Sequence, residues 1–540
     1  MTGNQNMGVR RRVLGAAVVG SLALSGCGAS FVAQEDAAQT GSVVAAAPTG
    51  SIVVAGCTPQ VPLIPTNTIE SCGAGILDAT LGRLVHYTGV SGRADNDLAA
   101  SITTSDVKKY TIKLKPGLKF SDGTAVAASS FVKAWNFGAY GPNRQVNSYL
   151  FEPIRGYKTV ATGAAKAMTG LKVVNGTTFA VELYSKGSTF RQRLGSVAFA
   201  PLPNSFFADK GSAFGKRPVT AGPYKVVSGT PATKFVLAAN PAYSGPARPR
   251  LAQVTFKMYR YDQDPYADLK AGTIDLLDYL PTGAKTVAAY KQELGGRTIE
   301  RSIGVFQSLN FPAAKADGSY RSAKLRQALL LAINRNKIIT QVFGGGRTPA
   351  AYGSKSGGCG TYCTYNPTLA KKLYKEAGGH SGTITIAYNA DSDHQRWVNA
   401  ACSSIKTALG ATCKGKPISS FATFRNQITA GTLTGLFRTG WQMDYPSIEN
   451  FLTPLYATGA ASNDGSYSNS SLDTKLAAAA AATDPATSNR LYQEAERLLR
   501  AKMPCIPLWY VRALGGHSPK IASATLTGFG TYDLTSITLS

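Results

Sequence analysis

Histidine is scarce in this chain of 540 residues, and the four copies are too scattered to suggest a metal site. No HExxH, CxxC, GxSxG or complete GxxxxGK(S/T) motif is present. Residues 410–416 approach the last pattern, but Pro417 stands where a Mg²⁺-binding Ser or Thr is needed, so we expect a loop there. These absences argue against an enzyme, and we expect neither a metal nor a cofactor. The histidines are His86, His380, His394 and His517.

Long apolar runs are also lacking, apart from residues 13–24 near the N-terminus. That run is shorter than the roughly 20 residues that span a bilayer, and three arginines at 10–12 precede it. Leu-Ser-Gly-Cys at 24–27 then resembles a lipobox, so we expect residues 1–26 to be a signal peptide and Cys27 to be acylated. An ordinary secretory signal and twin-arginine export through Arg11 and Arg12 are the alternatives.

Residues 27–50 are rich in Ala, Gly, Ser and Thr, which predicts a flexible tether. Export permits disulfides, and six of the eight cysteines lie near one another in sequence, although proximity does not prove pairing. Cys505, in an apolar strand-like run, is expected to be a core residue. The neighbouring cysteines are Cys57 and Cys72, Cys359 and Cys363, and Cys402 and Cys413.

Acidic residues are outnumbered by basic ones, 30 to 57, which gives a formal net charge of +27. Such a balance attracts anionic lipids, acidic wall polymers or acidic ligands, but most of it is expected to be solvated surface. Nucleic acid is not an expected partner, because the basic residues are scattered and no nucleic-acid-binding motif is present. Charged residues make up 16% and hydrophobic residues 44% of the chain, which is a globular composition.

Strand-like and helix-like patterns alternate along the chain, which predicts a mixed α/β fold. Residues 110–115 alternate polar and apolar side chains, and 384–388 form a short apolar run, as strands do. Residues 321–334 and 488–503 carry apolar stripes at helical spacing. Asn175-Gly176 separates two strand-like runs within 171–183 and predicts a hairpin.

Several segments, in order along the chain, resemble the peptide- and nickel-binding family of extracytoplasmic solute-binding proteins, family 5. The segment YTIKLKPGLKFSDGT, with the helix through Trp135, is similar to the central signature of that family. The similar segments are residues 110–124, 240–243 (NPAY), 271–275 (AGTID), 326–335 (RQALLLAINR), 440–446 (GWQMDYP) and 506–508 (IPL).

The resemblance implies a two-lobed α/β architecture, namely the periplasmic-binding-protein fold, type II-like, with an extra subdomain on the first lobe. Lobe I would be discontinuous, over residues 51–88, 216–303 and 507–540. The extra subdomain would cover residues 89–215 and lobe II residues 304–506. The chain would cross between the lobes near 303 and 507, and these crossings would form the hinge that closes on a ligand.

The resemblance also implies a function, the capture of peptides by the substrate-binding lipoprotein of an ABC importer. Such a protein is expected to work as a monomer outside the cell membrane, to be attached only by its lipid anchor, and to deliver ligand to permease and ATPase subunits. The alternatives are the same fold with a nickel chelate, haem or glycan as ligand, and a peptide-sensing signalling lipoprotein.

A zwitterionic peptide in a closed cleft needs partners for both of its terminal charges. By resemblance to the oligopeptide-binding members, Asp444 would hold the α-amino group, with Trp441 and Tyr445 beside it. Arg438, six residues earlier, and His394 would meet the carboxyl end. The alternatives are a turn-capping role for Asp444, a core role for the two aromatic residues, and ordinary surface roles for Arg438 and His394. Met443 departs from the Ala that many members have before the Asp.

Overall fold

The computed structural model describes residues 47–540 except 69, 90, 231, 261–263, 281–284 and 353–359. The predicted signal peptide, most of the tether, Cys27 and Cys359 therefore lie outside the described residues. The remainder of the tether, at residues 47–50, has no regular secondary structure.

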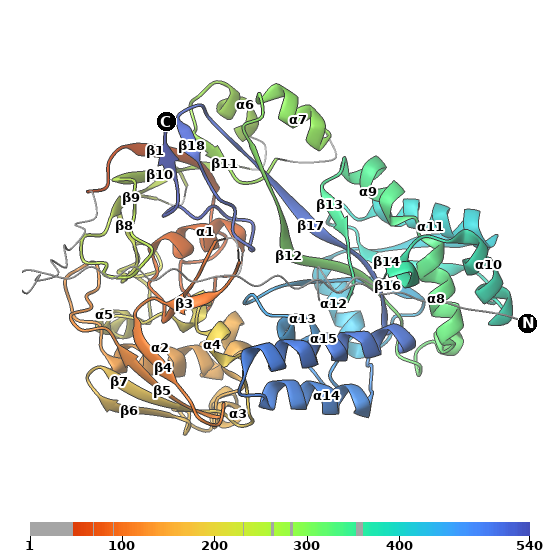
Figure 1. Cartoon of the computed structure of the whole chain (residues 1–540), viewed down its shortest axis with the longest axis horizontal. Coiled ribbons are helices and arrows are strands. Elements are labelled where there is room, and N and C mark those ends of the chain that lie inside the picture. Colours follow the sequence, from red (N-terminus) through yellow and green to blue (C-terminus); the bar gives the residue numbers. More distant parts are fainter. Residues whose placement is uncertain are drawn as a thin grey trace, which may run out of the picture. The chain divides into compact units, whose positions relative to one another are not determined.

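An 11-stranded mixed sheet runs through the described part of the chain (Figure 1). β13 (Arg347–Pro349) lies off the main path and pairs with β17. The main path is, in order, β15 (Cys413–Ile418), β14 (Ile384–Asn389), β16 (Leu436–Gln442), β12 (Thr298–Asn310), β17 (Cys505–His517), β11 (Leu276–Leu277), β1 (Ser51–Cys57), β10 (Gln253–Tyr259), β9 (Lys234–Ala239) and β8 (Tyr224–Thr230).

Strands β1 and β10 are parallel, and their paired residues run from Ser51 opposite Gln253 to Cys57 opposite Tyr259. At the other end of the sheet, β14 is parallel to both β15 and β16. Parallel neighbours need a crossover connection, and here α11 (Gln395–Leu409) and α12 (Phe421–Ala430) provide it. This part of the chain is therefore a βαβαβ unit, and β16 is its last strand.

The two longest strands, β12 and β17, form an antiparallel ribbon in the middle of the strand order, between β16 and β11 (Figure 1). Their register shifts between Ser302 and Phe306, where Gly304 instead bonds to segments on both sides. Its N–H donates to the Gly528 carbonyl and its own carbonyl accepts from the Met443 N–H. The irregularity coincides with the predicted crossing near residue 303, and the lobe boundaries themselves stay a prediction.

A separate four-stranded sheet occupies residues 99–182 and is covered by α2 (Ala128–Ala139). Its core is aromatic, with Trp135 packed edge-on against Phe179 and Phe199. The strand order is β4 (Ala99–Thr103), β5 (Lys109–Leu114), β7 (Thr178–Glu182) and β6 (Leu171–Asn175). Two small ribbons pair β2 (Val85–Tyr87) with β3 (Ala94–Asn96) and β18 (Ile521–Ser523) with β19 (Thr538–Leu539).

The remaining helices lie on both sides of the large sheet and around the smaller one (Figure 1). α15 shows how local sequence sets their bounds, because Asp484 caps its first turn and Pro504 follows its end. The helices are α1 (Ser71–Thr80), α3 (Tyr157–Ala161), α4 (Phe190–Arg193), α5 (Asn204–Ala208), α6 (Pro265–Lys270), α7 (Val287–Glu293), α8 (Ala323–Ala332), α9 (Arg335–Phe343), α10 (Pro367–Glu376), α13 (Glu449–Tyr456), α14 (Ser470–Ala481) and α15 (Pro485–Lys502).

Most predicted elements are confirmed. The alternating segment is β5, with every second side chain buried, and the predicted hairpin joins β6 to β7. The prediction of a loop over residues 410–416 is wrong from Cys413 onward. There the chain forms β15, because its backbone pairs with β14 although Lys414, Lys416 and Pro417 are exposed.

Disulfides join Cys57 to Cys72 and Cys402 to Cys413. Cys363 is also disulfide-bonded, and its sequence neighbour Cys359 is not described. Cys505 is a buried free cysteine, and burial raises the pKa of its thiol to about 12. A thiol with such a pKa stays protonated, which agrees with the predicted core role.

Candidate functional site

The strand β16 carries two of the predicted ligand contacts, Arg438 and Trp441, and it has one edge that no described strand covers over most of its length. It pairs with β12 from Phe437 to Gln442, but with β14 only at Leu436 and Phe437. The segment 438–442 therefore leaves main-chain groups available on the side of β14. An uncovered strand edge is a template for an added strand.

Asp444 follows the end of β16 and is held by two side chains. Its carboxylate accepts a 2.5 Å hydrogen bond from the Tyr149 hydroxyl and a 3.0 Å bond from the Asn450 amide. The Asn450 carbonyl oxygen in turn accepts from the Asp444 N–H at 2.8 Å and from the Trp441 indole at 3.3 Å. Because Asn450 is 1% exposed, this buried amide fixes the turn that carries Asp444.

Burial raises the pKa of Asp444 above its ordinary value. The hydrogen bonds from Tyr149 and Asn450 and the charge of Arg193 oppose this shift without cancelling it. The desolvation cost of the ionised carboxylate is thus only partly offset by its present partners. A cationic group that binds next to it therefore gains a strong electrostatic interaction.

A buried cluster of charged and aromatic side chains packs against the turn that carries Asp444. Arg193, at the end of α4, lies 3.4 Å from Glu449 and 4.7 Å from the centre of the Tyr445 ring. The Tyr445 hydroxyl donates to Glu449 at 2.5 Å, and the Tyr445 side chain is 0% exposed. Tyr445 therefore packs in the core of the four-stranded-sheet region, and in this arrangement it positions the turn.

Arg438 lies at the opposite end of the uncovered edge. Its guanidinium donates from Nε to the Asn389 carbonyl oxygen at 2.9 Å, and Nη2 donates to the same atom. The group lies 5.3 and 5.4 Å from the ring centres of Phe421 and Phe424. Burial, followed by the charge of Arg425, lowers the pKa of Arg438 to about 10, so it stays positively charged at neutral pH.

His394 precedes α11 and belongs to the Arg438 end of the strand. Its Nδ1 accepts a 3.1 Å bond from the Trp397 indole, which leaves the proton of the neutral ring on Nε2. Burial, with the nearby charge of Arg438, lowers the pKa of His394 to about 4. At neutral pH, His394 is an uncharged hydrogen-bond donor. The structure thus groups Trp441, Asp444 and Tyr445 at one end and Arg438 and His394 at the other.

The turn at residues 443–450 separates two cavities. The first has a volume of about 410 Å³ and is lined by Met443 and Pro446 from the turn, by α1, and by residues 527–535 near the C-terminus. The second has a volume of about 1130 Å³ and is lined by Trp441 and Asp444. Its opposite wall comes from residues 149–193.

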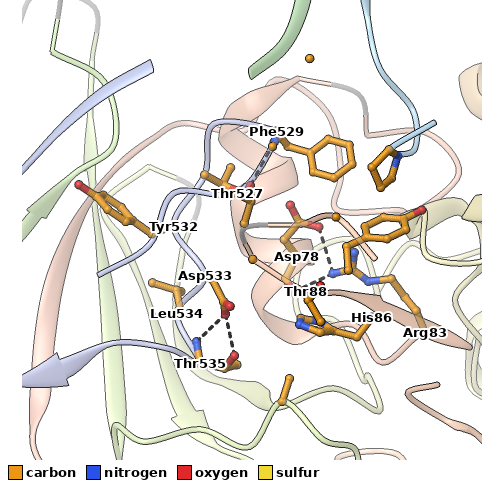
Figure 2. Close-up of a pocket in the computed structure, with 18 of the residues that line it drawn as sticks. Asp78, Arg83, His86, Thr88, Thr527, Phe529, Tyr532, Asp533, Leu534 and Thr535 are labelled. Carbon is orange, nitrogen blue, oxygen red and sulfur yellow. Dashed lines mark hydrogen bonds and ion pairs between the residues drawn. The ribbon is translucent and has the colours of Figure 1, made fainter. Parts of the chain in front are cut away.

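Figure 2 shows side chains that line the first cavity. Asp78 and Arg83 form a 3.1 Å ion pair there, and Thr527 and Asp533 hold the C-terminal segment through hydrogen bonds to their own backbone neighbours. Tyr510, which is 3% exposed, also lines this cavity, and its buried hydroxyl has no hydrogen-bond partner among the described residues. A buried hydroxyl without a partner carries a desolvation cost.

The side chain of Met443 lies against Gly304 of β12 and against Gly528. A Cβ at Gly304 would lie 2.3 Å from the Met443 sulfur, and one at Gly528 would lie 2.8 Å from its terminal methyl group. The two glycines therefore make room for this side chain. The methionine fills space at the irregular part of β12.

Sequence reasoning missed Tyr149, Arg193, Glu449 and Asn450. Asn450 is six residues from Asp444, so a buried polar residue at the start of an apolar helix could have drawn attention to it. The contact of Tyr149 with Asp444 spans 295 residues, and no local pattern predicts it.

No cluster of three or more His, Cys, Asp and Glu side chains suited to a metal is found in the described residues. None of the described helices combines the length and apolar character of a membrane-spanning segment.

Known proteins are similar to this chain over most of its length. A curated relative, the glutathione-binding protein GsiB of Escherichia coli strain K12, is 27% identical over 472 residues, covering 82% of this chain and 86% of its own.

Solved structures match the fold. The unliganded open form of MppA, a periplasmic murein tripeptide-binding protein, superposes with a TM-score of 0.78 at 20% identity, over 91% of this chain and 98% of MppA. OppA of Haemophilus influenzae, in complex with the peptide RPPGFSPFR, superposes with a TM-score of 0.70 at 23% identity, over 91% and 99% of the two chains. These likenesses confirm the predicted fold class.

The family of bacterial extracellular solute-binding proteins, family 5, has a sequence model whose middle region matches residues 94–463. This match covers more than half of the chain and includes the four-stranded sheet, β12, β16 and Asp444. Proteins of this family bind solutes and do not transform them. The chain belongs to the bacterial extracellular solute-binding proteins, family 5.

Proposed function

We propose that this protein captures short peptides along the uncovered edge of β16. The α-amino group meets Asp444, the peptide backbone pairs with residues 438–442, and the carboxyl end meets Arg438 with help from His394. The observation that carries the proposal is the geometry of β16, with an uncovered edge that has a half-buried anion after one end and a half-buried cation at the other. Backbone pairing gives affinity without reading side chains, so ligands of varied sequence fit.

The spacing of the two charges bears on ligand length. Six residues of extended chain span about 20 Å, and the Asp and Arg side chains shorten the gap that a ligand must bridge. A peptide of roughly three to six residues fits this gap. GsiB is a glutathione-binding protein, and MppA binds a murein tripeptide, so relatives that bind short ligands support this range.

We further propose that the protein is the substrate-binding lipoprotein of an ABC importer. It would be anchored to the outer face of the cell membrane through acylated Cys27, with the segment up to residue 50 as its tether. Closure of the two predicted lobes around the β12 and β17 crossing would present the loaded peptide to the permease and its ATPase subunits. The irregular register at Gly304 supports a hinge at this point.

Calorimetry with matched peptides tests the ligand class. The purified protein is titrated with a tetra-alanine peptide, its N-acetylated form and its C-terminal amide. We expect the free peptide to bind at least about tenfold more tightly than either blocked form, because each block removes a charged hydrogen-bond partner. Equal affinity of all three forms would contradict the end-charge assignment. Failure of any peptide to bind, together with binding of a nickel chelate, haem or glycan, would overturn the peptide proposal.

The anchor is tested separately. Full-length protein is expected in the membrane fraction of the expressing bacterium, and Cys27→Ser is expected to release it. Retention of Cys27→Ser on the membrane would rule out attachment through this residue.

A further inference from the structure

The second cavity extends well beyond the carboxylate of Asp444. Its volume of about 1130 Å³ exceeds what a single ammonium group needs and is at the upper end of typical ligand pockets. One wall comes from residues 149–193, which we call the subdomain wall, and the other from residues 441–492, which we call the lobe II wall. Ser188 joins the two walls through hydrogen bonds of its hydroxyl to the Ala479 carbonyl on α14 and to the Ser488 hydroxyl on α15.

The two walls carry opposite charge. The subdomain wall contributes four basic side chains and one acidic side chain, whereas the lobe II wall contributes three acidic side chains and no basic one. Opposed walls of this kind select a ligand that carries both signs. The basic residues are Arg155, Lys158, Lys186 and Arg193, and the acidic residues are Glu152, Asp444, Glu449 and Asp473.

Most of these charges already have partners. Arg193 pairs with Glu449, Arg155 pairs with Glu182 at 3.0 Å, and Asp473 accepts two bonds from Thr458. Lys158 and Lys186 are exposed, and neither has an ion-pair partner among the described side chains. Glu152 is likewise exposed. In the described part of the chain, the subdomain wall therefore carries two exposed lysines and one exposed glutamate without an ion-pair partner.

Aromatic surface lies next to these lysines. The Tyr184 side chain is 75% exposed and Tyr149 is 41% exposed, and both line the cavity. Because both rings line one cavity, they give its surface an aromatic part on which a ligand can pack. They offer an apolar face to the methylene groups of a side chain whose end is charged.

We propose that the second cavity receives the first residue of the peptide, and that this residue carries a carboxylate of its own, which Lys158 and Lys186 bind while Asp444 holds the adjacent amine. The chemical class is an amino-terminal acidic residue, joined to the next residue either through its α-carboxyl or, as a γ-glutamyl group, through its side chain. The inference rests on the proposed function, because it assumes that Asp444 meets the α-amino group.

The test is calorimetry with four peptides of equal length, Glu-Ala-Ala, Gln-Ala-Ala, Lys-Ala-Ala and γ-Glu-Ala-Ala. We expect an acidic first residue to bind about tenfold more tightly than Gln-Ala-Ala, because a carboxylate facing ammonium groups forms charge-assisted bonds. Lys-Ala-Ala is expected to bind more weakly than Gln-Ala-Ala. A preference for Glu-Ala-Ala identifies the α-linked form, and a preference for γ-Glu-Ala-Ala identifies the γ-linked form.

The double variant Lys158→Gln/Lys186→Gln separates this inference from the proposed function. It is expected to lose the preference for an acidic first residue and to bind Gln-Ala-Ala as the unaltered protein does. Lys172→Gln, an exposed lysine on β6 that does not line the cavity, is the matched control and should keep the preference.

The possible failures are distinct. If all four peptides bind equally, this inference is wrong and the proposed function stands. If none of them binds, the proposed function is wrong as well. If the preference survives in the double variant, other residues recognise the carboxylate and the assignment of the two lysines is wrong.

Discussion

At the Arg438 end of β16, the hydrogen bonds and ring contacts of the guanidinium come from Asn389 on β14 and from two rings of α12. At the Asp444 end, Asn450 is six residues away in the chain, whereas Tyr149 and Arg193 come from a distant part of it. The cationic end is complete within a single βαβαβ unit. The anionic end is complete only when residues 149–193 pack against the turn. Its hydrogen bonds and ion pair therefore depend on the position of these residues.

The largest expected effect comes from replacing Arg193, whose ion pair with Glu449 supports the Asp444 end. Arg193→Met leaves Glu449, which is 4% exposed, without its cationic partner. Because a buried charge without its partner is destabilising, we expect the free energy of unfolding to fall by about 3–5 kcal/mol. Urea denaturation measures this change. The double variant Arg193→Met/Glu449→Gln should recover most of that loss. If the single variant is as stable as the unaltered protein, the cluster does not support the turn.

The next effect concerns binding. Asp444→Asn keeps the shape of the side chain but removes the charge, so peptides with a free amine should lose about 2–5 kcal/mol, or at least about thirtyfold in affinity. The same variant should bind N-acetylated peptide as the unaltered protein does. Its unfolding free energy should not fall, because burial already disfavours the ionised carboxylate. A free peptide that binds the variant normally would place the amine elsewhere.

A smaller effect is expected at the cationic end. Arg438→Gln should weaken binding of free peptides by about tenfold, since a charged hydrogen bond contributes about 1.5 kcal/mol and Asn389 already occupies two of the guanidinium donors. The C-terminal amide, which has no carboxylate to lose, serves as the control ligand. An equal loss for the amide would show that the variant disturbs β16 instead.

The smallest effect is a pH dependence that separates the two ends. The amine binds the ionised form of Asp444, whose pKa is raised by burial. As the pH falls, protonation of Asp444 competes with the ligand, so affinity declines through this raised pKa, at less acidic pH than for an ordinary aspartate. Calorimetry from pH 7 down to the acidic limit of folding measures the decline.

Two variants assign the pH dependence. Asp444→Asn should abolish the decline, whereas His394→Gln should preserve it, because His394, with a pKa of about 4, is already neutral throughout most of this range. A decline that disappears only in His394→Gln would move the titration to the cationic end.

Much of the fold follows from local pattern. The alternation in β5 and the stripe of α15 specify a strand and a helix because one face of each must be buried. The loop predicted at residues 410–416 failed for the opposite reason. β15 lies at an end of the sheet, where its two lysines are exposed, and it is held by backbone pairing with β14 and by the disulfide from Cys413 to Cys402.

The sequence by itself determined that a cationic and an anionic side chain, Arg438 and Asp444, lie six residues apart and resemble the ligand contacts of the family. Only the tertiary structure decided what surrounds them. It buried Tyr445 in the aromatic core, brought Tyr149 to Asp444 across 295 residues, and left Lys158 and Lys186 facing an open cavity. The physical reason is that local periodicity reports which face of an element is apolar, whereas charge partners are chosen by packing between elements that are far apart in the chain.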